Sequence, residues 1–226
     1  MDKIAFFLGV YKDQDRAKNT IQSLRFFYPL ASIISIADGV KNADYSQFCF
    51  EHGINYWVGE RFKLMQFGGA WTARFLAAML YQTNADVLIK IDPDSGIHSP
   101  LDVSGFPDAD LFGNIRTTGG RAHIQGGFIA FRRTAAEALL NSKLLGSAKY
   151  CCHSYSYPRF QLPYLQEGEE SSSEWLTCED VILYDAAHEL GLTIADFDQV
   201  CCHYRSCPLD APSRYAITHP YPYFAD

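Results

Sequence analysis

The chain has 226 residues, 48% of them hydrophobic and 15% aromatic, which is long and apolar enough to bury one sizeable core. Its formal net charge is −7 with no basic block or stripe, which argues against a nucleic-acid partner. No apolar run reaches the ~20 residues that cross a bilayer, and the short run after Met1 lacks a cleavage-type flank. We therefore expect a cytoplasmic globular protein without a membrane span.

Strands and helices alternate along the first part of the chain. Short apolar runs that end in turn residues predict strands, and the longer segments between them have helical composition. We expect strands at 3–10, 33–37 and 87–91, and helices at 15–27 and 70–80. This alternation is typical of an α/β fold with a mostly parallel central sheet flanked by helices.

The second part of the chain contains further elements and one unusual segment. We expect strands at 110–115, 128–131 and 192–197, and helices at 133–140 and from Glu179 onward. Residues 146–176 are rich in Tyr, Pro, Ser and Cys and predict a long mobile loop, with 160–176 as a lid. Residues 205–226 show little regular pattern. No linker divides the chain, so we expect one domain over residues 1–226.

The segment Val87–Asp94 ends an apolar strand in two carboxylates. The run Val-Leu-Ile-Lys-Ile predicts a strand buried on both faces, with Lys90 in its middle. Pro93 cannot donate to a ladder, so Asp92 and Asp94 should lie in a turn at the carboxyl end of this strand, where ligands of α/β sheets bind. Two neighbouring carboxylates repel each other unless a cation or donors stabilise them, which indicates a divalent metal site. An ordinary polar exit from a strand is the alternative.

The cysteines predict reduced thiols. There are seven, an odd number, and no signal peptide precedes them. Cys151-Cys152-His153 and Cys201-Cys202-His203, with Cys207 nearby, offer ligands for a structural zinc ion. Adjacent cysteine pairs differ from the usual C-x-x-C spacing, so free thiols are the better interpretation.

Two features of the first part suit a ligand at the same sheet edge. Asp38 ends the second strand before a glycine, where a carboxylate can accept from a base or ribose hydroxyl; an Asp-Gly turn is the alternative. Gly68-Gly69 precedes a helix that carries Arg74, and such a helix start can approach phosphates while arginine donates to them. A solvated Arg74 is the alternative.

Two features of the second part suit the other side of a site. Gly126-Gly127 precedes the apolar run 128–131, and glycine there permits close approach of a ligand or an ordinary bulge. Asp180 follows Thr177 and Glu179 at an expected helix start, where the helix dipole favours a carboxylate that acts as general base. The pair Thr177 and Asp180 also matches a capping box, which is the structural alternative.

The order of these motifs resembles the GT-A fold glycosyltransferases that use nucleotide-sugars. Asp92-Pro93-Asp94 is similar to their D-x-D motif, although proline is not its commonest central residue. Gly126-Gly127-Phe128 is similar to their glycine-bearing acceptor segment. Glu179-Asp180-Val181, with Leu190-Gly191-Leu192 after it, is similar to the E-D-V pattern of inverting β-1,3-type members. His219 resembles the late histidine that completes their metal site.

The resemblance implies a GT-A-like, Rossmann-like domain with a nucleotide-binding half at about 1–100 and an acceptor half at about 101–226. It implies transfer of a sugar from a nucleotide-sugar, with UDP-sugar as the expected donor, to a glycan or other hydroxyl-bearing acceptor, with inversion. The implied site residues are Asp180 as catalytic base; Val10, Tyr11, Asp38, Arg74 and Asp92 for the donor; Gly126, Gly127, Trp175 and Glu179 on the acceptor side; and Asp92, Asp94 and His219 for Mn²⁺ or Mg²⁺.

Two alternatives to this function stay open from the sequence. A nucleotidyltransferase also uses a metal at a sheet edge, but it would usually show a glycine-rich basic loop after the first strand, where this chain has Val10-Tyr11-Lys12-Asp13. A sugar- or nucleotide-binding module without catalysis is the other, and the presence of Asp92, Asp94, Asp180 and His219 together argues against it.

Overall fold

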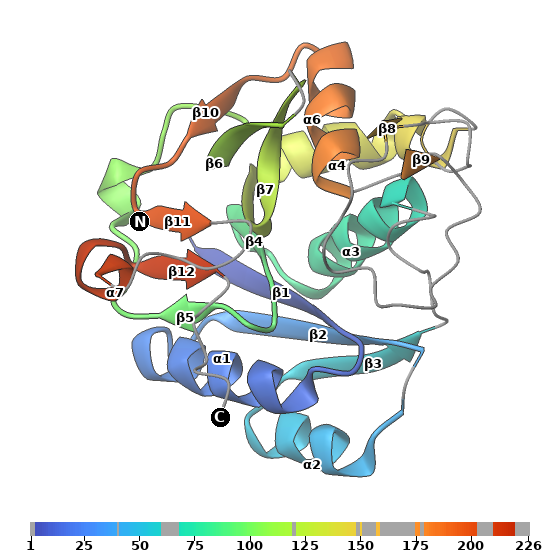
Figure 1. The fold of residues 1–226 in the computed structure, drawn as a ribbon. Helices are drawn as coiled ribbons and strands as arrows, with labels where there is room; N and C mark the ends of the chain where they lie inside the picture. Colours follow the sequence, from blue (N-terminus) through green and yellow to red (C-terminus); the bar gives the residue numbers. More distant parts are fainter. Residues whose placement is uncertain are drawn as a thin grey trace.

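The computed structural model describes residues 3–39, 41–59, 68–118, 121–147, 150, 157–158, 175–176, 179–202 and 210–219. Figure 1 shows the arrangement of the elements. In chain order they are β1 (Ile4–Val10), α1 (Gln14–Phe27), β2 (Ser32–Asp38), α2 (Ala43–Glu51), β3 (Asn55–Gly59), α3 (Gly68–Gln82), β4 (Val87–Ile91), β5 (Gly96–Ile97), η1 (Val103–Gly105), β6 (Leu111–Thr118), β7 (Arg121–Arg132), α4 (Arg133–Asn141), η2 (Leu144–Gly146), β8 (Tyr157–Pro158), β9 (Trp175–Leu176), α6 (Glu179–Glu189), β10 (Ile194–Asp196), β11 (Val200–Cys202), α7 (Ala211–Arg214) and β12 (Ile217–His219).

A seven-stranded sheet in the order β10-β6-β7-β4-β1-β2-β3 forms the centre of the fold. Only β7 runs against the others, because it pairs antiparallel with both β4 and β6. Strand β4 lies between β1 and β7, and all five of its residues are buried. The α/β class and the mostly parallel sheet expected from the sequence are confirmed.

Helices cover both faces of this sheet (Figure 1). Helices α3, α4 and α6 pack on one face with Phe7 and Leu88, while α1 and α2 pack on the other face with Phe6 and Ile89. Successive residues of a central strand therefore pack into the cores on opposite faces of the sheet, which explains why the apolar runs of these strands are continuous. Each large apolar side chain buried in this way contributes roughly 1.5–3 kcal/mol.

A second sheet, in the order β11-β12-β5, joins the late part of the chain to the turn after β4. Strand β12 pairs antiparallel with β5, with Thr218 opposite Gly96 and Ile217 opposite Ile97. The same strand pairs parallel with β11. This pairing places His219 beside the Asp92–Asp94 turn.

Several elements differ from the expectations. Gly68 and Gly69 are the first two residues of α3 and do not precede it. A Cβ at Gly69 would lie 2.3 Å from the Tyr150 carbonyl oxygen, so the glycine permits this close packing of the helix. Gly126 and Gly127 lie within β7, whose polar first half hides the strand pattern. Residues 192–197 are not the last strand, since β11 and β12 follow.

Other expectations concern residues that lie wholly or partly outside the ranges that the structure describes. Most of 146–176, including the expected lid, lies outside the described residues, as do Cys151, Cys152, His203 and Cys207. Cys201 and Cys202 are described, and both are buried in β11. None of the helices in the described ranges combines the length and the hydropathy of a membrane span.

Candidate functional site

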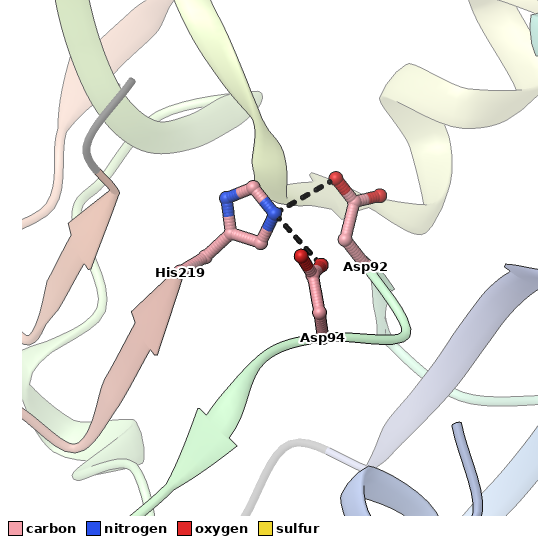
Figure 2. A group of neighbouring side chains, drawn as sticks. All are labelled: Asp92, Asp94 and His219. Atoms are coloured by element: carbon pink, nitrogen blue, oxygen red, sulfur yellow. Dashed lines mark ion pairs between the residues drawn. The ribbon is translucent and has the colours of Figure 1, made fainter. Parts of the chain in front are cut away.

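Two carboxylates and an imidazole converge at the carboxyl end of β4 (Figure 2). The Nε2 atom of His219 lies 3.0 Å from Asp94 Oδ1 and 3.2 Å from Asp92 Oδ2. One ligand atom from each of the three residues lies within 4.8 Å of the other two. The structure thus brings together the three residues that the sequence suggested as metal ligands.

The turn that carries the two carboxylates is held on both sides. After β4, the backbone N–H of Asp92 donates to the Gly127 carbonyl of β7 at 3.1 Å, and the N–H of Ser95 donates back to the Asp92 carbonyl at 3.2 Å. The buried hydroxyl of Thr20 on α1 lies 2.8 Å from the carbonyl oxygens of both Pro93 and Ser95. The turn is therefore anchored to the neighbouring strand and to the first helix.

His219 reaches the turn because β12 pairs with β5 and because β7 has a glycine beneath the imidazole. A Cβ built on Gly127 would lie 2.1 Å from His219 Nδ1 and 2.2 Å from Cγ, closer than any side chain can approach. The space that a larger residue would fill at Gly127 is thus filled by the imidazole. The sequence suggested Gly127 as an acceptor-side residue, whereas the structure places it against a metal-ligand candidate.

The charges in this group favour a cation among the carboxylates. Burial alone would lower the pKa of His219, but the hydrogen bond with Asp94 and the charges of Asp92 and Asp94 raise that pKa above its ordinary value. Burial opposes ionisation of Asp94, yet the His219 hydrogen bond and charge, with Arg16 at 3.7 Å from Oδ2, hold the pKa of Asp94 below its ordinary value. Two carboxylate oxygens and an imidazole nitrogen make a donor set that fits a divalent ion such as Mn²⁺.

A buried lysine lies directly behind this group. The Lys90 side chain on β4 is 2% exposed, and its Nζ lies 2.5 Å from Asp92 Oδ1 and 3.4 Å from Glu179 Oε1. It also donates to the Gly126 carbonyl oxygen of β7. Sequence reasoning noted Lys90 only as a lysine within an apolar strand, although a charge at a buried strand position is itself a signal of nearby carboxylates.

Glu179 and Asp180 open helix α6 and form the second acidic group of the site. Burial, together with the charges of Asp180 and Asp92, raises the pKa of Glu179 to about 7, with Lys90 opposing. Burial and the charge of Asp92 raise the pKa of Asp180 to about 6, opposed by the hydrogen bond from the Val181 N–H and by Lys90. Asp180 is the less buried of the two acidic residues. A carboxylate with a pKa near neutrality can take up a proton and release it again, which suits a general base.

The expected donor residues lie at the carboxyl ends of β1 and β2. Val10 is the buried last residue of β1, and the Tyr11 N–H after it donates to Asp13 Oδ1 at 3.2 Å. Asp38 is the last residue of β2 and is buried. Because both strands are parallel to β4, these residues share the sheet edge of the candidate metal group.

Arg74 on α3 reaches the same edge further along the sheet. Its guanidinium lies against Gly59, where a Cβ would stand 1.1 Å from an arginine nitrogen, and 5.7 Å from the Trp71 ring. Gly59 is the register partner of Asp38, so the arginine lies near the end of β2. Sequence reasoning missed Arg16, which faces Asp94 from the first turn of α1.

The expected acceptor side is described only in part. A Cβ on Gly126 would lie 3.1 Å from Glu179 Oε1 and 3.8 Å from the Cβ of Asp180, so this glycine lets α6 approach β7. Trp175 lies in β9, where its backbone is opposite Pro158 of β8, and its side chain is outside the described residues. Thr177, the partner in the alternative capping box, is outside them too.

Comparisons with known proteins give a fold but no sequence family. No model of a known protein family matches the chain, and no curated protein sequence matches it. Among solved structures, the galactosyltransferase LgtC in complex with donor and acceptor sugar analogues matches with a TM-score of 0.55 at 10% identity, over 96% of this chain and 86% of LgtC.

Two further solved structures have the same architecture. The glycosyltransferase GlyE of Streptococcus pneumoniae TIGR4 matches with a TM-score of 0.50 at 13% identity, over 97% of this chain and 55% of GlyE. The bifunctional glycosyltransferase WbbM matches with a TM-score of 0.55 at 9% identity, over 100% of this chain and 46% of WbbM. The chain therefore has the GT-A fold of these glycosyltransferases, as its motifs led us to expect.

Proposed function

We propose that this protein is a metal-dependent glycosyltransferase that moves a sugar from a UDP-sugar to a hydroxyl-bearing acceptor such as a glycan. The observation that carries the proposal is the convergence of Asp92, Asp94 and His219 at the carboxyl end of β4. Ligands of open α/β sheets bind outside this edge. The GT-A architecture supports the same reaction class.

In this proposal Asp92, Asp94 and His219 would hold the metal ion. When bound, the ion supplies Lewis-acid stabilisation of the charge on the departing diphosphate. The imidazole nitrogen makes the donor set softer than the oxygen ligands that suit Mg²⁺, so we favour Mn²⁺. Val10, Tyr11 and Asp38 would bind the nucleoside, and Arg74 the diphosphate, from the same sheet edge.

On the acceptor side, Asp180 would act as the general base. Its carboxylate would take the proton from the acceptor hydroxyl while that oxygen bonds to the anomeric carbon. The bond from this carbon to the diphosphate oxygen breaks, and its electron pair leaves with the UDP. Attack from the face opposite the leaving group inverts the anomeric carbon. Gly126, Trp175 and Glu179 would border the acceptor.

The proposal is tested by a donor screen that measures nucleotide release. UDP-, GDP-, CMP- and ADP-sugars are each incubated with the protein, Mn²⁺ and a panel of sugar acceptors, with and without EDTA. We expect release from a UDP-sugar that requires an acceptor and is abolished by EDTA. Release from a GDP-sugar alone would correct the donor, and no release from any donor would refute the transferase.

Ligand binding gives an independent check that needs no acceptor. A ligand that binds only the folded protein adds ~2.7 kcal/mol of stability at 100 times its Kd. UDP with Mn²⁺ should therefore raise the melting temperature clearly. A cytoplasmic location also stays part of the proposal; the buried free thiol of Cys49 suits a reducing compartment.

A further inference from the structure

Lys90 lies where the metal-binding and acceptor halves of the site meet. Its ammonium group has three N–H donors, and three acceptors surround it. They are a carboxylate oxygen of Asp92 after β4, the carbonyl oxygen of Gly126 in β7, and a carboxylate oxygen of Glu179 in α6. Each acceptor thus comes from a different segment of the chain.

A buried cation at this position is stabilised by its surroundings. Its nitrogen lies 2.5 Å from a carboxylate oxygen of Asp92 and 3.4 Å from one of Glu179, although the residue is only 2% exposed. A buried ion pair contributes little to stability compared with well-packed apolar side chains, so its presence points to a role beyond folding.

The ammonium group fixes the orientation of one candidate metal ligand. Asp92 Oδ1 lies 2.5 Å from Lys90 Nζ, while Asp92 Oδ2 faces His219 Nε2 at 3.2 Å. Oδ1 of Asp92 is thus bound by Lys90, and Oδ2 is directed toward His219, the neighbouring candidate metal ligand. Groups that hydrogen-bond a ligating carboxylate in this way typically change metal affinity by 10–100-fold when they are removed.

The same ammonium group holds the first residue of α6. Glu179 is buried and lies 3.4 Å from Lys90 Nζ through Oε1, and Asp180 follows it directly in the chain. A shift of Glu179 would move the start of the helix and the Asp180 carboxylate with it. Gly126 completes the arrangement, because any side chain at this position would crowd Glu179.

We propose that Lys90 is a positioning residue that couples the two halves of the site, orienting Asp92 toward the metal ion and holding α6 so that Asp180 faces the acceptor. This inference rests on the proposed function. Lys90 itself touches neither the donor nor the reacting atoms in this account. It acts through Asp92 and Glu179.

The test separates positioning from folding by using two variants. Lys90→Met removes the ammonium group and leaves the buried acid Glu179 without this hydrogen-bond donor, so the melting temperature should fall. In the double variant Lys90→Met/Glu179→Gln no unpaired charge is buried there, so most of the lost melting temperature should return. Lys18→Met is the matched control, because Lys18 also pairs with an aspartate, but this lysine is only half-buried and its partner Asp15 is exposed.

The first readout is the Kd of Mn²⁺ alone, measured by electron paramagnetic resonance without nucleotide or acceptor. We expect ~10-fold weaker binding in Lys90→Met and in the double variant, and no change in Lys18→Met. Wild-type affinity in the double variant would overturn the inference. So would tighter binding in Lys90→Met, the result expected if Lys90 acts only by its positive charge. A wild type that binds no Mn²⁺ would overturn it as well.

The second readout is the pH dependence of transfer, and it tests the link to Asp180. The charged groups that act on this carboxylate are Lys90 and Asp92, from β4 and its turn, and Glu179 on its own helix. Removal of the ammonium group should raise the pH at which transfer falls on the acid side. If transfer by Lys90→Met falls at the same acidic pH as transfer by wild type, Lys90 does not act on Asp180. A wild type that binds Mn²⁺ but transfers no sugar would refute the proposed function and leave the Mn²⁺ test of Lys90 valid.

Discussion

Gly127 lies directly beneath the imidazole of His219, so that a Cβ at this glycine would stand 2.1 Å from His219 Nδ1. The two residues come from β7 and β12, which belong to different sheets. The absence of a side chain at Gly127 therefore leaves room for His219 in the candidate metal group. A larger residue at Gly127 should weaken metal binding in the same way as the loss of a ligand.

Gly127→Ala should displace the imidazole from Asp92 and Asp94. We expect Mn²⁺ binding at least ~10-fold weaker, similar to His219→Ala, because a ligand is moved away. Overpacking should also cost ~1–3 kcal/mol of stability. Gly146→Ala is the control, since a Cβ there meets no atom within 4 Å. Calorimetric titration of Mn²⁺ measures the effect, and wild-type affinity in Gly127→Ala would contradict the placement of His219.

Thr20→Val tests the anchor of the turn after β4. The substitution keeps the shape but removes the hydroxyl that bonds the carbonyls of Pro93 and Ser95. We expect a loss of ~1–3 kcal/mol in the free energy of unfolding, with weaker Mn²⁺ binding. Thr72→Val is the matched control: Thr72 is fully buried, and its hydroxyl has no hydrogen-bond partner within the described part of the chain.

Denaturant unfolding with and without Mn²⁺ measures both threonine variants. Thr72→Val should be neutral or stabilising, because it removes a buried polar group that forms no bond. If Thr20→Val is as harmless as Thr72→Val, the contact between α1 and the turn does not support the site.

Much of the fold could be predicted from the sequence because the central strands are continuous apolar runs. Burial on both faces makes 4–10, 32–38 and 87–91 conspicuous, and the turn residues Asp38 and Pro93 mark where two of them end. The same reasoning failed for β3, whose residues are largely exposed or half-buried, and for β12, which has only three residues. Such elements depend on their neighbours more than on their own composition.

The candidate site could be predicted where one short segment supplies the chemistry. Asp92 and Asp94 stand out because they follow a buried strand. Thr20 and Arg16 could not be found in this way, because they lie on a helix whose polar residues suit solvent equally well. Lys90 was visible as a charge in a buried strand, but its three acceptors come from distant segments that only the folded chain brings together.

The raised pKa of Glu179 predicts a pH-dependent stability. A folded-state pKa of about 7 against an ordinary 4.5 means that the folded protein binds this proton more tightly. Protonation therefore stabilises the fold, and this contribution is lost as the pH rises through about 7. We expect the melting temperature of wild type to fall, relative to Glu179→Gln, between about pH 5 and pH 8. If the melting temperatures of the two proteins change with pH in the same way, the pKa of Glu179 is not raised in the folded protein.

Asp180→Asn distinguishes a catalytic base from a structural cap. Asparagine keeps the shape but takes no proton at neutral pH, so transfer should slow at least ~100-fold while UDP affinity stays near normal. In wild type, transfer should fall as the pH drops below about 6, where Asp180 becomes protonated. If the variant keeps more than about a tenth of wild-type transfer, Asp180 is not the base, and Glu179 becomes the next candidate.

A calorimetric titration of UDP into wild type and Asp94→Asn, each with and without Mn²⁺, measures whether Asp94 holds a metal ion for the donor. Asp94 lies 3.0 Å from His219 through Oδ1 and would be one of the residues that hold the metal ion. Asp15→Asn serves as the control, because its carboxylate is 97% exposed. We predict that Mn²⁺ strengthens UDP binding to wild type and to Asp15→Asn, and that this gain is lost in Asp94→Asn. A full Mn²⁺-dependent gain in Asp94→Asn, or no gain in wild type, would contradict the account.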